Sequence, residues 1–236
     1  FVTSVEGDFT KRITNTPGQE RMVKWSPDSK SLIYAAERGR DGWGIYKTVI
    51  TNNEEPYFFN ATTLHEEALI INKTDNFQPK FSPDGKSIAY IEERNILKVL
   101  NLNTKKTVTL LPKGHNHSYA DGDWGFEWSP DSKWLLVDDQ RNYFGTSNTA
   151  LIKADGTGEI KYPILSGFGE EGARWQMNGK MISWLSSKYG RKSLAIQGSR
   201  EVDVFAAFLD QEAYDSFTLN KEEFSLEKER KDKEKK

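Results

Sequence analysis

The sequence has 236 residues, of which 36% are hydrophobic and 12% aromatic, and its formal net charge at pH 7 is -2. Its 33 basic and 35 acidic side chains are interspersed, which argues against nucleic acid as a partner. Cysteine is absent, so disulfides and any Cys-based zinc site or nucleophile are excluded. No apolar stretch approaches the roughly 18 residues that span a bilayer, and we expect no membrane span.

One turn motif recurs four times along the chain. It consists of an aromatic residue followed by Ser-Pro-Asp, Ser or Gly, and Lys, at Trp25–Lys30, Phe81–Lys86 and Trp128–Lys133, with a weaker copy at Trp175–Lys180. Pro presets the first corner of a tight turn, Asp accepts backbone N–H groups, and Gly or Ser tolerates the last corner. The copies start roughly 47 to 56 residues apart, close to the length of one four-stranded propeller blade.

In chain order, the first predicted element is a strand at Thr10–Thr14, which ends a partial blade over residues 1–14. Each motif is followed by an apolar run that predicts a strand covered on both faces, at Leu32–Ala36, Ile88–Ile91, Leu135–Val137 and Met181–Trp184. Third strands are predicted at Gly44–Val49, Leu97–Leu102, Asn148–Ala154 and Ser193–Gln197. Outer strands are predicted near Ala68–Asn72, Thr107–Leu111 and Ile160–Leu165.

These elements predict an all-β fold, a β-propeller of about four four-stranded blades plus a half blade, taken from a ring of six or seven. The blades cover residues 25–72, 81–111, 128–165 and 175–209. Residues 210–236 are rich in charge, and we interpret them as a charged linker or helix leading toward a further domain. A β-sandwich is less favoured, because its strands would show no such repeat.

The repeat from Trp25 to Trp184 resembles the propeller repeats shared by TolB, the prolyl oligopeptidases and the tricorn-type proteases. Residues 202–223 are similar to the junction that follows the last propeller blade of bacterial tricorn-like serine peptidases, and Ser118–Asp123 also resembles that family. The resemblance implies a multidomain serine peptidase as the parent, periplasmic or secreted, in which propellers control peptide access. A cytoplasmic parent is the alternative.

The function implied by this resemblance is that of a non-catalytic propeller segment that binds peptides and contacts the other domains of its parent. The sequence has no Gly-x-Ser-x-Gly elbow, so we assign no catalytic residue and no cofactor to it. Whether the chain belongs to an enzyme stays open. The alternatives are a TolB-like interaction scaffold with no enzyme attached and a metal-dependent sugar-acid lyase propeller.

Candidate peptide-binding residues lie in the loops between the second and third strands of three blades. They are Arg38, Arg40, Trp43, Arg141, Tyr143 and Arg191. A guanidinium with aromatic cover suits a peptide carboxylate, and matching loops of a propeller reach the same rim. The alternative for the first loop is a solvated hairpin whose Trp43 packs against the next blade.

A cluster of possible metal ligands precedes the third motif, at His115, His117, Asp121 and Asp123. Imidazoles and carboxylates suit a divalent metal only if they converge. Their loop is rich in Gly and Asn, so turn hydrogen bonding is the favoured role of the two Asp residues, and we predict no metal site. The Asp residues of the repeated motif lie on separate blades and are interpreted as turn residues.

Four blades and a half blade do not close a ring of six or seven. Closure removes exposed sheet edges, and an arc therefore leaves apolar faces uncovered at its first and last blades. We expect self-association through these terminal blades, or an open arc whose ends are covered by another copy.

Overall fold

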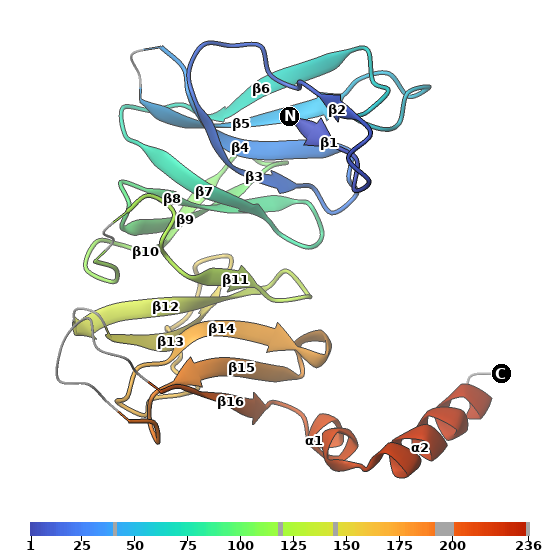
Figure 1. The fold of residues 1–236 in the computed structure, drawn as a ribbon. Coiled ribbons are helices and arrows are strands. Elements are labelled where there is room, and N and C mark those ends of the chain that lie inside the picture. The colour runs from blue at the N-terminus through green and yellow to red at the C-terminus, as the bar shows by residue number, and fades with distance from the viewer. Residues whose placement is uncertain (40–41, 118–119, 144–145, 192–200, 235–236) are drawn as a thin grey trace.

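The computed structural model describes residues 1–39, 42–117, 120–143, 146–191 and 201–234. The chain forms four antiparallel sheets that follow one another, with two helices at the C-terminal end (Figure 1). A short pair, β1 (Val2–Thr3) and β2 (Thr10–Lys11), precedes the first sheet. Within these residues, no helix is long and apolar enough to cross a membrane.

The first two sheets have four strands each, and every strand pairs with its neighbour in sequence. The first sheet contains β3 (Glu20–Trp25), β4 (Ser31–Glu37), β5 (Trp43–Ile50) and β6 (Leu64–Ile70). The second contains β7 (Asn76–Phe81), β8 (Ser87–Glu92), β9 (Ile96–Asn101) and β10 (Thr107–Leu111). This meander is the blade that the repeat predicts.

The third and fourth sheets have three strands each among the described residues. The third contains β11 (Phe126–Trp128), β12 (Trp134–Tyr143) and β13 (Thr146–Lys153). The fourth contains β14 (Glu171–Gln176), β15 (Met181–Ser186) and β16 (Asp203–Phe208), with a short 3-10 turn at Met177–Gly179. All-β architecture and propeller-type blades are thus confirmed, and within the described part of the chain two of the blades have three strands where four were predicted.

The outer strand predicted at Ile160–Leu165 is reduced to a single bridge. Lys161 pairs with Leu151 of β13 through two backbone hydrogen bonds of 2.7 and 3.0 Å. In an antiparallel ladder the next hydrogen-bonded position lies two residues further, which here is Pro163. Proline has no N–H to donate, so the ladder stops after one pair.

In the fourth sheet, β16 takes the place of the predicted third strand. It pairs with β15 in unbroken register from Met181↔Phe208 to Ser186↔Asp203. The predicted strand at Ser193–Gln197 lies outside the described residues. The segment interpreted as a junction therefore contributes a strand of the last blade before it leaves the sheet.

The motif turns have the chemistry that the sequence predicts. In the first copy, Ser26 Oγ donates to Asp28 Oδ1 at 2.6 Å, and the same carboxylate oxygen accepts the Lys30 N–H at 3.0 Å. The copies at residues 82–87 and 129–134 repeat these bonds. The hydrogen bond from Ser26, followed by that from Lys30, holds the pKa of Asp28 below its usual value. These Asp residues are turn residues, as expected.

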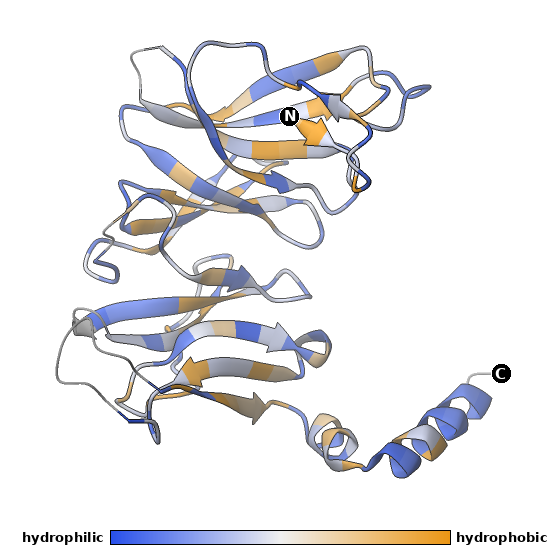
Figure 2. Cartoon of the chain, in the orientation of Figure 1, coloured by the Kyte–Doolittle hydropathy of each residue, from blue (hydrophilic) through white to orange (hydrophobic). Residues whose placement is uncertain are grey.

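Apolar side chains fill the spaces between successive sheets. One cluster joins the first and second sheets, a larger one joins the second and third, and another joins the third and fourth. The second strands supply most of the fully buried residues, including Ile33, Ile88, Leu135, Leu136 and Ile182. Figure 2 shows hydrophobic residues concentrated on the strands.

Two helices follow β16 and continue away from the sheets (Figure 1). Helix α1 (Gln211–Thr218) begins at the N-cap Asp210 and contacts β16 through ring contacts of Phe208. Helix α2 (Lys221–Glu234) buries none of its residues and is mostly hydrophilic in Figure 2. The predicted charged C-terminal helix is thus confirmed.

Candidate functional site

The first strands of the sheets converge along one edge, which we call the inner edge. β3 contacts β7, and β11 contacts β14. Between the second and third sheets, the side chains of Gln78 and Lys80 cross from β7 to the backbone next to β11. Gln78 Nε2 donates to the carbonyl oxygen of Trp124, and Lys80 Nζ donates to that of Phe126, both at 2.6 Å. The inner edge is therefore joined from sheet to sheet.

A β-bulge interrupts the first strand in three of the sheets, where the ladder register shifts. At each bulge one residue has a positive φ: Met22 (58°), Gln78 (56°) and Gly172 (62°). Such a φ is unfavourable for Met and Gln, so the surrounding structure must hold it. A bulge re-aims the side chains around it and is common beside functional sites.

The position directly before the motif aromatic is charged in every sheet. It is occupied by Lys24, Lys80, Glu127 and Arg174. Glu127 Oε2 accepts the backbone N–H of Trp175 at 3.1 Å. Among the described residues, the side chains of Lys24 and Arg174 have no hydrogen-bond or ion-pair partner. Three cations and one carboxylate make this row positive.

A pocket of about 210 Å³ opens at the inner edge where β7, β12 and β14 meet, and we call it the inner-edge pocket. Its lining combines charged, polar and aromatic side chains, including Gln78, Lys80, Trp124, Phe126, Asp138 and Arg174. It presents two cations, two carboxylates and an amide in one cavity but, among its described lining residues, no hydroxyl or thiol. These groups suit the binding of a polar ligand.

Lys80 occupies an environment that weakens its charge. Burial, followed by the positive charges of Lys24 and Arg174, lowers the pKa of Lys80 to about 8. Its ammonium lies 4.2 Å from the centroid of the Phe126 ring, which supplies a favourable cation–π contact. The side chain is therefore held in place and only partly ionised near pH 8.

The pKa of Asp138, on β12, is shifted in the opposite direction, upward. Burial, together with the negative charge of Glu171, raises the pKa of Asp138 to about 6. Its Oδ2 accepts the backbone N–H of Gly172 at 3.4 Å. A Cβ on Gly125 would lie only 2.0 Å from Oδ2, so the carboxylate occupies space that a glycine leaves open. A carboxyl and an ammonium group in one pocket, both with pKa values shifted toward neutral pH, are typical of a functional site.

Among the predicted rim residues, Arg38 is engaged within its own sheet. Its Nη2 lies 2.9 Å from Glu20 Oε1 and 3.1 Å from Glu66 Oε2, and its guanidinium lies 5.2 Å from the Tyr46 ring centroid. The Tyr34 hydroxyl also donates to Glu66. Burial, together with that bond to Glu66, raises the pKa of Tyr34. Arg38 thus holds two carboxylates together inside the first blade.

Trp43 packs against the next blade, which is the arrangement given above as the alternative. The centroid of its ring lies 5.6 Å from that of Phe77 on β7, and its backbone N–H donates to Asp75 Oδ1 at 3.0 Å. Arg21 covers the ring at 5.3 Å. These contacts anchor the loop to the second sheet.

The remaining rim residues stay apart from this pair. Arg141 lies over the Tyr162 ring at 5.2 Å, and the exposed Arg191 pairs with Glu201 at 2.5 Å. Arg40 lies outside the described residues, and for Tyr143 only the backbone is described, paired with Thr146. A peptide-binding role for the six residues stays a prediction.

The predicted ligand-like cluster at residues 115–123 disperses. His115 Nδ1 lies 3.1 Å from the buried Asp139, whose other oxygen accepts the Tyr162 hydroxyl at 2.5 Å. Asp121 pairs instead with Arg94 at 2.5 Å. In the part of the chain that the structure describes, no three His, Cys, Asp or Glu side chains gather as metal ligands.

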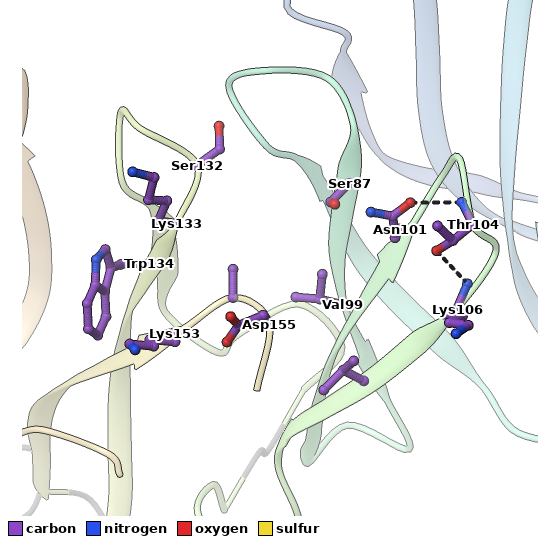
Figure 3. A pocket seen from close by; sticks show the side chains of 12 residues that line it. Ser87, Val99, Asn101, Thr104, Lys106, Ser132, Lys133, Trp134, Lys153 and Asp155 are labelled. Carbon is purple, nitrogen blue, oxygen red and sulfur yellow. Dashed lines mark hydrogen bonds between the residues drawn. The ribbon is translucent and has the colours of Figure 1, made fainter. Parts of the chain in front are cut away.

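A larger groove of about 520 Å³ separates the second and third sheets beside the motif turns (Figure 3). Lys133 and Lys153 line one wall and Lys106 the other. Lys153 Nζ lies 5.7 Å from the Trp134 ring centroid. The three lysines are exposed, so they fix the position of a ligand less well than the buried groups of the inner-edge pocket.

Comparison with known proteins links this fold to peptidases and to TolB. No protein-family profile matches the chain. A segment of 116 residues, 47% of the chain, is 32% identical to dipeptidyl-peptidase 5 of Porphyromonas gingivalis and covers 16% of that enzyme.

Three solved structures share the arrangement of the sheets. TolB from Acinetobacter baumannii has a TM-score of 0.56 and 18% identity, over 88% of this chain and 45% of that one. The tricorn protease has a TM-score of 0.54 and 13% identity, over 82% of this chain and 18% of that one. A prolyl endopeptidase has a TM-score of 0.53 and 12% identity, over 81% and 28%. The chain spans less than half of each relative, and at these identities the likeness establishes a TolB-like propeller fold.

Proposed function

We propose that the chain is a non-catalytic propeller segment of a serine-type peptidase, and that it binds peptides at its inner edge on their way to an active site elsewhere in the protein. The observation that carries the proposal is the 32% identity with a dipeptidyl-peptidase over 116 residues. The fold shared with the tricorn protease and a prolyl endopeptidase supports the same association.

The inner-edge pocket gives this role a physical basis. In a closed propeller the blades surround a central channel, which their first strands line. A peptide in that channel would meet Gln78, Lys80, Asp138 and Arg174. Such groups bind peptide N–H, C=O and charged groups through hydrogen bonds in a partly desolvated place, where these bonds are stronger than in water.

The test is to separate binding from cleavage. The purified chain is incubated with fluorescent casein and with a fluorophosphonate that labels active serine hydrolases, and its binding to short peptides is measured by NMR. We expect peptide binding without cleavage or labelling, whereas the protein encoded by the complete gene should show all three. Cleavage by the chain alone that the serine reagent blocks would overturn the proposal.

A second candidate function is a TolB-like interaction scaffold without an attached enzyme. The likeness to TolB favours it, because it extends over 88% of the chain. The encoded protein distinguishes the two candidates: a complete gene without a serine-bearing catalytic segment would favour the scaffold. Export from the cytoplasm, peptide binding by the rim residues and self-association through terminal blades remain predictions under either function.

A further inference from the structure

The inner-edge pocket has unused cationic donors on two different sheets. Lys80 has three N–H donors, and one of them goes to the carbonyl oxygen of Phe126. Arg174 has five donors and, among the described residues, no hydrogen-bond or ion-pair partner. Both side chains line the same cavity, Lys80 from β7 and Arg174 from β14. An anion between them would be held from two sides.

The backbone around the two cations, and the contacts of Lys80, already hold their positions in the absence of a ligand. Lys80 is held by the 2.6 Å bond to Phe126 and by its ring. A β-bulge lies two residues before each cation, at Gln78 in β7 and at Gly172 in β14. Little side-chain freedom is left for a ligand to remove at Lys80, which favours binding.

We propose that the inner-edge pocket binds one carboxylate group of a peptide, held between Lys80 and Arg174. The inference rests on the proposed function, because it names the chemical group that a bound peptide presents there. Two sources supply this group: the C-terminus of a peptide and an Asp or Glu side chain. A cavity of about 210 Å³ has room for a carboxylate with the short chain that carries it.

Asp138 makes this binding depend on pH. Its carboxyl lines the same pocket, where it faces Lys80 from β7 and Glu171 and Arg174 from β14. Lys24 and Glu127 also act on the charge of Lys80, and Asp123 lies at the lining. Below pH 6 Asp138 gains a proton, which removes its repulsion of a bound carboxylate and supplies a donor. A peptide carboxylate stays largely ionised there, since its pKa is about 3.5 to 4.3.

The test compares peptides that differ only in one charge. Acetyl-Ala-Ala-Ala with a free C-terminus is titrated into the 15N-labelled chain beside its C-terminal amide, and the amide signals of Gly125 and Gly172 are followed. Acetyl-Ala-Glu-Ala-amide and acetyl-Ala-Gln-Ala-amide test the side-chain source. We expect the acid to bind about 5-fold or more tightly than its matched neutral peptide, as charge-assisted bonds imply. The pair that shows the difference identifies the source.

Two variants test the residues that hold the carboxylate. Lys80→Met and Arg174→Gln are each expected to weaken binding of the peptide with the free carboxylate about 5- to 10-fold. Binding of its neutral amide counterpart should stay unchanged. Arg174 is exposed, so its variant should fold even if the Lys80 variant does not. Lys106→Met, which removes an exposed lysine of the separate groove, is the matched control and should change affinity less than about 2-fold.

The pH profile supplies a further readout. Affinity for the acid should rise about 3- to 10-fold from pH 7.5 to 5, and Asp138→Asn should bind tightly at both pH values. Equal binding of acids and amides would overturn the carboxylate inference while leaving peptide binding intact. No binding of any peptide would instead contradict the proposed function. Binding lost equally in Lys106→Met would show general charge attraction and overturn the assignment to this pocket.

Discussion

The indole Nε1 of Trp128 donates a hydrogen bond of 3.1 Å to the backbone carbonyl oxygen of Lys80. The motif aromatic of the third sheet is thus hydrogen-bonded to the first strand of the second sheet. Trp25 has the same place in the motif, but among the described residues no four-stranded sheet precedes its own, only the short pair of β1 and β2. It is 47% exposed and meets Phe58 of its own blade, at 5.3 Å between ring centroids.

This difference predicts that equal substitutions at the two motif positions have unequal effects. Trp128→Phe removes the indole donor, leaves the Lys80 carbonyl without that partner and opens space in the core between the sheets. We expect a loss of about 1–3 kcal/mol in the free energy of unfolding. Trp25→Phe, the matched control, should cost less than about 0.5 kcal/mol. Urea denaturation followed by circular dichroism measures both, and equal losses would contradict the prediction.

Asp138→Asn should stabilise the chain at neutral and alkaline pH. The pKa of Asp138 is about 6 in the folded state against 3.8 for a free Asp. The folded state therefore binds more protons between these values, and stability is lost as the pH rises through this window. Asn does not titrate, so the variant should gain on the order of 1–3 kcal/mol relative to the native chain between pH 4 and pH 8.

The control for that experiment is Asp155→Asn. The hydrogen bonds from Thr157 lower the pKa of Asp155, so this carboxylate favours folding above its pKa. Its removal should give no stabilisation at pH 8. Thermal melts of both variants at pH 4, 6 and 8 decide the matter, and a pH-independent effect of Asp138→Asn would exclude titration as the cause.

Gly125→Ala should displace the carboxylate of Asp138. The added methyl group would lie 2.0 Å from Oδ2, so one of them must move, at a cost of about 1–3 kcal/mol in the free energy of unfolding. The cost should fall when the same change is made in an Asp138→Ala background, because the clashing atom is then absent. A double-mutant cycle by urea denaturation measures this coupling. Additive effects would contradict the contact.

Arg38→Met should destabilise the first sheet. It leaves Glu20 and Glu66 without the cation that lies between them, and the Arg38 side chain is only 15% exposed. We expect a loss of about 1–3 kcal/mol, smaller at high salt concentration. Arg191→Met is the control, since Arg191 is 90% exposed and its ion pair with Glu201 should leave the urea midpoint unchanged. An unchanged midpoint in Arg38→Met would mean that the side chain is available for other partners.

The blades could be predicted from the sequence because the turn that defines them is local. Its hydrogen bonds join Asp28 to Ser26 and Lys30 within five residues, and the later copies do the same. The prediction of an outer strand at residues 160–165 failed for an equally local reason, because Pro163 has no N–H to continue the ladder. The pairing of β16 with β15 was different, because it depends on a register that no local signal specifies.

The inner-edge pocket could not be predicted, because its groups come from distant parts of the chain. Lys80 and Asp138 approach each other only through the stacking of the second and third sheets, and the bulge at Gln78 has no sequence signal of its own. One signal was present: the residue before each motif aromatic is charged in all four copies. The ion pairs of Arg38 could not be predicted for the same reason, since its partners lie on β3 and β6 and depend on sheet pairing.

The bond between Glu127 and the Trp175 N–H has a consequence for measurements of local opening. That amide hydrogen is bound by a side chain of the preceding sheet. Its hydrogen–deuterium exchange should therefore report the parting of the third and fourth blades, while amides within β15 report the unfolding of the last blade itself. The exchange rate of this single amide would thus report how often the third and fourth blades separate while each blade stays folded.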